Sequence, residues 1–82
     1  MENLNQVNWK ERERELEAFF SDRFRRMWLQ HTRLGSVCIT AFPLPSEESR
    51  YPSYRIFTAT KISDWSLENL KNIVLSQMQP AP

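Results

Sequence analysis

The chain has 82 residues, 40% hydrophobic and 26% charged, and its eleven Lys and Arg against ten Asp and Glu give a formal charge of +1. This is the composition of a globular domain, and the small charge excludes a global electrostatic attraction to nucleic acid or to an anionic membrane. A lone cysteine excludes an internal disulfide and a Cys-based zinc site and favours a reducing compartment, so we expect a cytoplasmic protein.

The first element in chain order is predicted to be a long helix over residues 9–34, after a flexible leader over residues 1–8. Asn8 and Glu11 have the spacing of an N-cap and its reciprocal partner in the first turn. Gly35 is the one glycine of the chain, and a left-handed glycine at this point would end the helix.

Hydrophobic spacing supports this helix. Its apolar residues recur three, four or seven positions apart and would form one face that packs into a core. The residues of this stripe are Trp9, Leu16, Phe20, Phe24, Met27, His31 and Leu34. Large aromatics at helical spacing are ordinary core material, so we interpret the stripe as packing and not as a cofactor or base-stacking surface.

The second half of the predicted helix, RFRRMWLQHTR, is rich in arginine. Acidic residues concentrate near the expected start of the helix and arginines near its expected end, which matches the helix dipole. Trp28 is different, because a large apolar ring on the predicted polar side is a candidate anchor for a binding partner.

Two strands are predicted next, over residues 36–42 and 54–62, where β-branched and aromatic residues are frequent. The connection over residues 43–53 carries three prolines and is predicted to be a long, solvated loop. A second helix is predicted over residues 67–78, with Ser66 as its N-cap.

The sequence therefore predicts an α+β protein of α-β-β-α order, with one domain over residues 9–79 and a flexible tail over residues 80–82. The long and the short helix would pack on a two-stranded antiparallel hairpin. Because such a hairpin has two open edges, we expect a symmetric dimer that extends the sheet or packs the long helices together.

Catalytic chemistry has few candidates in this sequence. His31 falls on the apolar stripe, and Cys38 falls within a predicted strand, where a buried structural thiol is the ordinary interpretation. A single glycine excludes the phosphate-binding loop motifs, and the carboxylates do not have the spacing of a calcium loop or of paired catalytic acids. We expect no enzymatic activity, no cofactor and no metal site.

The leading functional hypothesis is a small non-enzymatic protein-interaction module, an adaptor or regulatory subunit that is homodimeric and binds an acidic protein partner. The alternative hypothesis is a nucleic-acid-associated regulator that uses the arginine-rich end of the first helix. No membrane partner is expected. The candidate partner-binding residues are Arg23, Arg25, Arg26, Trp28, Arg33, Phe42, Tyr51 and Tyr54.

Overall fold

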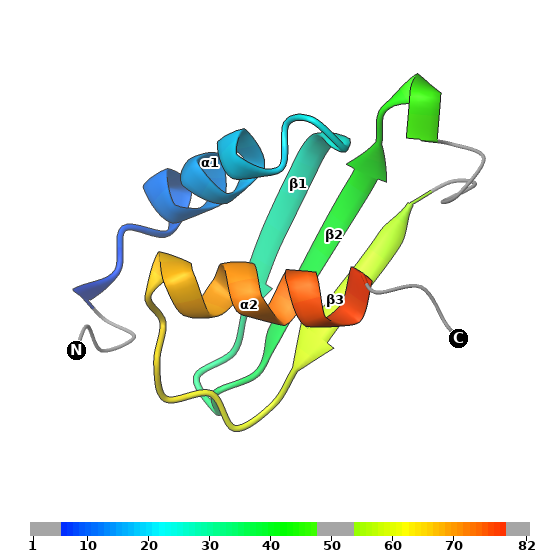
Figure 1. Ribbon diagram of the computed structural model, residues 1–82. Helices are drawn as coiled ribbons and strands as arrows, with labels where there is room; N and C mark the ends of the chain where they lie inside the picture. Colours follow the sequence, from blue (N-terminus) through cyan, green and yellow to red (C-terminus); the bar gives the residue numbers. More distant parts are fainter. Residues whose placement is uncertain (1–5, 48–53, 79–82) are drawn as a thin grey trace.

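The computed structural model describes residues 6–47 and 54–78 (Figure 1). It confirms the α+β class and contains two helices and one antiparallel sheet with the strand order β1-β2-β3. The elements in chain order are α1 (Trp9–Phe19), β1 (Phe24–His31), β2 (Val37–Pro43), the short 3-10 helix η2 (Pro45–Glu47), β3 (Arg55–Ala59) and α2 (Leu67–Met78).

The prediction of one helix over residues 9–34 is wrong, because α1 ends at Phe19 and residues 24–31 form a strand. A β-bulge explains why apolar residues of this strand have the spacing of a helix. The pairing between β1 and β2 shifts between Phe24 and Arg26, so Arg25 is an extra residue in the strand. The bulge places Phe24 and Met27 on the same face of the sheet at a spacing of three, which is also a helical spacing.

The sheet consequently has three strands, and the predicted α-β-β-α order is corrected to α-β-β-β-α. The strand expected over residues 36–42 corresponds to β2, which lies at the centre of the sheet and pairs with both neighbours. The strand expected over residues 54–62 is shorter in the structure. The helix expected over residues 67–78 coincides with α2.

Gly35 adopts the expected left-handed conformation, with φ of 89°, but it lies in the β1–β2 hairpin instead of ending a helix. The N–H of Gly35 donates to the carbonyl of Thr32, and its own carbonyl accepts from Ile62 at 2.8 Å. A Cβ at this position would lie 3.1 Å from the Ile62 carbonyl oxygen. Glycine is therefore needed both for the backbone angle and for the close approach of the chain after β3.

The N-cap of α1 forms at Asn8, as the sequence predicts. The side chain of Asn8 accepts a hydrogen bond from the N–H of Glu11 at 3.2 Å and so caps the helix. Val7, inside the predicted leader, is buried in the core, so the leader assignment is wrong at this residue. The other terminal prediction, a flexible tail over residues 80–82, lies outside the described residues, as does most of the predicted loop over 43–53.

One face of the sheet forms the hydrophobic core with the helices. In Figure 1, α2 crosses this face while α1 lies beside β1. The buried side chains come from both helices and all three strands and include Leu16, Phe20, Phe24, Met27, Ile39, Phe57, Leu70 and Val74. A chain this short has room for one such core, and within residues 6–47 and 54–78 neither α1 nor α2 covers the opposite face of the sheet.

Candidate functional site

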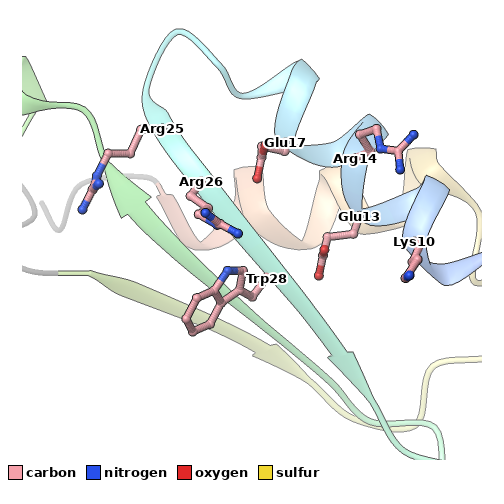
Figure 2. A pocket seen from close by; sticks show the side chains of 7 residues that line it. All are labelled: Lys10, Glu13, Arg14, Glu17, Arg25, Arg26 and Trp28. Atoms are coloured by element: carbon pink, nitrogen blue, oxygen red, sulfur yellow. The ribbon is translucent and has the colours of Figure 1, made fainter.

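The uncovered side of the sheet, which we call the open face, is the main candidate binding surface. Strand register assigns alternate residues of each strand to this face, because directly paired residues of antiparallel strands share a face. Its residues are Arg26, Trp28, Gln30, Cys38, Thr40, Phe42, Ile56 and Thr58, with Tyr54 at the start of β3. Neither α1 nor α2 lies over it, and in Figure 2 the Trp28 indole projects from β1 on the side opposite α2.

An aromatic row crosses the open face. The ring centroids of Trp28 and Phe42 are 4.8 Å apart, and those of Phe42 and Tyr54 are 6.3 Å apart. Trp28 is 47% exposed, Tyr54 is 54% exposed, and Ile56 beside the row is 49% exposed. These residue types supply large contact areas at the centres of protein interfaces, which makes the row a candidate anchor.

The outer edge of β1 is covered by carboxylates of α1. The N–H of Leu29 donates to Glu13 Oε2 at 2.8 Å, and the N–H of Met27 donates to Glu17 Oε2 at 3.0 Å. The two carboxylates on α1 and the two N–H groups on β1 are similarly spaced, because four residues of helix rise about 6 Å and two residues of strand rise about 6.6 Å. Two N–H groups that could pair with another strand are therefore already satisfied.

The outer edge of β3 is covered in a similar way by α2. The side-chain amide of Gln77 accepts from the N–H of Thr58 at 3.2 Å and donates to the carbonyl of Thr58 at 2.7 Å. One side chain thus replaces both hydrogen bonds that a neighbouring strand residue would make. The expected dimer contact, extension of an open-edged hairpin, loses its basis here because both sheet edges are covered at their centres. The expected packing of long helices loses its basis because α1 ends at Phe19.

A groove of about 490 Å³ runs between α1 and β1, next to the aromatic row (Figure 2). Its lining carries four exposed cations, two carboxylates and an indole: Lys10, Glu13, Arg14, Glu17, Arg25, Arg26 and Trp28. The carboxylates point from α1 toward β1, where they meet the backbone N–H groups described above. Trp28 belongs both to this groove and to the open face.

The predicted site residues divide into three groups. Arg26, Trp28, Phe42 and Tyr54 lie together on the open face, and Arg25 lies beside them in the groove. The other two arginines lie elsewhere: Arg23, in the α1–β1 turn, pairs with Asp22 and donates to Met78 Sδ, and Arg33 lies in the β1–β2 turn. Tyr51 lies outside the described residues.

The helix-dipole interpretation of the arginines is wrong, because all four lie after the end of α1. They occupy turns and a strand, so their positions need another explanation.

Sequence reasoning missed several residues of the candidate surface, among them Lys10, Arg14 and Ile56. Lys10 and Arg14 are four residues apart on α1, a spacing that places both on one side of a helix. Nothing in the sequence indicates that this side faces the arginines of β1, because those arginines were assigned to the same helix. Ile56 lies two residues from both Tyr54 and Thr58 and so shares their face of the strand; this period of two is the available signal.

The two candidate reactive residues, His31 and Cys38, occupy different surroundings. The His31 ring stacks on Trp9, with centroids 3.8 Å apart. Cys38 is half-buried and pairs with Gln30 on the open face, whereas His31 pairs with Val37. Within residues 6–47 and 54–78, no cluster of three His, Cys, Asp or Glu side chains is arranged to hold a metal ion. In the same ranges, neither helix is long and apolar enough to cross a membrane.

Comparison of the chain with protein-family models, with curated proteins and with solved structures finds no match.

Proposed function

We propose that this protein is a small non-enzymatic interaction module, an adaptor or regulatory subunit, that self-associates through the open face of its sheet. The observation that carries the proposal is the aromatic row of Trp28, Phe42 and Tyr54 on a face that neither helix covers. Removing apolar surface from water is favourable, so partly exposed large rings that lie together favour association.

The chemistry of the open face favours a second copy of the chain as its occupant. Among the described residues of this face, the charged ones are Arg26 and the bulge residue Arg25 beside it, both near one end of β1. A surface with so little charge is matched by another surface with little charge, and two-fold symmetry supplies one of identical composition. The mode of contact would be face to face, since side chains already cover both sheet edges.

We prefer this function to association with nucleic acid. A phosphate backbone needs cations along its path, and the described residues of the open face offer it guanidinium groups at one end of β1 alone, those of Arg25 and Arg26. We place the protein in the cytoplasm, because its single cysteine, half-buried in β2, suits a reducing environment.

The experiment is light scattering after size exclusion at micromolar protein concentration. We expect the full chain to elute with twice the monomer mass. Ile56→Glu adds a charge to the open face at an exposed position and should give a monomer with unchanged circular dichroism. Leu34→Glu is the control, because Leu34 is also an exposed aliphatic side chain, at 90% against 49% for Ile56, but lies in the β1–β2 turn.

A wild-type monomer at these concentrations would overturn the self-association. An Ile56→Glu dimer would show that any dimer uses another surface.

A further inference from the structure

The groove between α1 and β1 gathers more positive charge than it neutralises. Lys10 and Arg14 line it from α1, and Arg25 and Arg26 line it from β1. The ion pairs formed between described residues use none of these four cations. Against Glu13 and Glu17, the four cations leave the lining with a formal charge of +2, so the groove attracts an anionic group.

The two carboxylates determine how an occupant can bind. Because Glu13 and Glu17 accept the N–H groups of Leu29 and Met27, a peptide cannot add to this part of β1 as a further strand. Recognition must come from side chains instead. The groove offers cations on two opposed walls and, from Trp28, an exposed apolar ring at the margin of the open face.

We propose that this groove binds an acidic segment of a partner protein. Asp or Glu carboxylates of the segment lie between the α1 wall of Lys10 and Arg14 and the β1 wall of Arg25 and Arg26, while an apolar side chain of the segment contacts Trp28. Arginine forms paired hydrogen bonds to carboxylates, which gives the segment a defined orientation. The proposal rests on the proposed function as an interaction module, because it names the chemistry of that module's partner.

Charge spacing favours a peptide over a nucleic acid in this groove. A nucleic acid carries a phosphate at every nucleotide and would bring some of them against Glu13 and Glu17. Carboxylates of a peptide are separated by neutral residues and can bind at the cations alone. The occupant that fits the groove is therefore a peptide whose acidic side chains are separated from one another.

The test uses fluorescence anisotropy at low salt with a labelled peptide of alternating Glu and Leu residues. The matched peptide with Gln in place of Glu is the control for charge, and an oligothymidine of equal formal charge is the control for nucleic acid. We expect the wild-type chain to bind the Glu peptide and to lose affinity with added salt. The Gln peptide should bind at least about tenfold more weakly.

Lys10→Glu/Arg14→Glu reverses the charge of the α1 wall and should lower the affinity for the Glu peptide roughly tenfold or more. Arg25→Glu repeats the test from the β1 wall if the double variant does not fold. Arg33→Glu is the control, because Arg33 is an exposed arginine in the β1–β2 turn, outside the groove. It should bind like the wild type.

Three outcomes would overturn the proposal: no binding of the Glu peptide by the wild type, equal binding by the α1-wall variant, or tighter binding of oligothymidine, which would assign the groove to nucleic acid. The test is separable from self-association, because the α1-wall substitutions leave the open face unchanged. If the protein is a dimer that does not bind the Glu peptide, the groove proposal alone is refuted. If it is a monomer that binds the Glu peptide, self-association alone is refuted.

Discussion

Glu17 accepts a 3.0 Å hydrogen bond from the backbone N–H of Met27, so a helix side chain takes the place of a neighbouring strand at the edge of the sheet. Glu13 does the same for Leu29. This relationship fixes α1 beside β1, forms the floor of the groove and closes the edge through which small sheets often associate. The binding surfaces are therefore the open face and the groove.

Removing these carboxylates should destabilise the fold. Glu13→Ala and Glu17→Ala each leave a strand N–H without its partner, and we expect a loss of about 1 to 2 kcal/mol for each in urea unfolding. Glu15→Ala is the control, since Glu15 is exposed and makes a 3.9 Å ion pair with Arg12 that contributes at most about 0.5 kcal/mol. Equal losses for the Glu15 and Glu17 variants would contradict the role of the carboxylates at the edge.

Two adjacent phenylalanines should respond very differently to truncation. Phe20 is 1% exposed and lies in the core, so Phe20→Ala should cost about 3 to 5 kcal/mol. Phe19 is 48% exposed and packs beneath the Lys71 ammonium, 4.2 Å from its ring centroid, so Phe19→Ala should cost about 1 kcal/mol. Chemical denaturation measures both. If Phe20→Ala does not fold, Phe20→Leu provides the comparison, and a smaller loss at position 20 than at position 19 would refute the packing of α1.

Gly35→Ala should destabilise the hairpin end of the protein. A Cβ at φ of 89° is strained and would also press against the Ile62 carbonyl oxygen, so we expect a loss of roughly 1 to 3 kcal/mol in thermal or urea unfolding. The neighbouring change Leu34→Ala removes an exposed side chain and should stay within about 0.5 kcal/mol of the wild type. A neutral Gly35→Ala would show that the turn has another conformation.

Because of Asp64, the free energy of unfolding should depend on pH in the acidic range. Hydrogen bonds from Ser66, first from its backbone N–H at 3.0 Å, lower the pKa of the Asp64 carboxyl below its ordinary value of 3.8. A carboxyl whose pKa is lowered by folding stabilises the folded state above its unfolded pKa, and this contribution is lost as pH falls from about 3.8 through the folded value.

Asp64→Asn should therefore be less stable than the wild type at neutral pH, and the difference should shrink as the pH falls below 3.8. Unfolding curves across this range measure the difference directly. A gap between the two proteins that stays constant with pH would contradict the role of the charged carboxylate.

Several features of the fold could be read from the sequence because their causes are local. The N-cap at Asn8, the helix over 67–78, the central strand near 37–43 and the left-handed Gly35 each depend on residues close together in the chain. Capping, hydrophobic period and backbone freedom act over a few residues, so a short stretch contains the information. Trp28 is exposed as expected, but on the open face of a sheet and not on the polar side of the predicted helix.

The tertiary structure alone decided that residues 24–31 form a strand. Arg, Met, Leu and Gln are good helix formers, and the bulge at Arg25 gives Phe24 and Met27 a helical spacing. The strand forms because it pairs with β2, which is specified by residues farther along the chain, and such pairing overrides local propensity. Because residues 24–31 form β1 and not the second half of a long helix, α1 and β1 become the two walls of the groove, and β1 completes the open face.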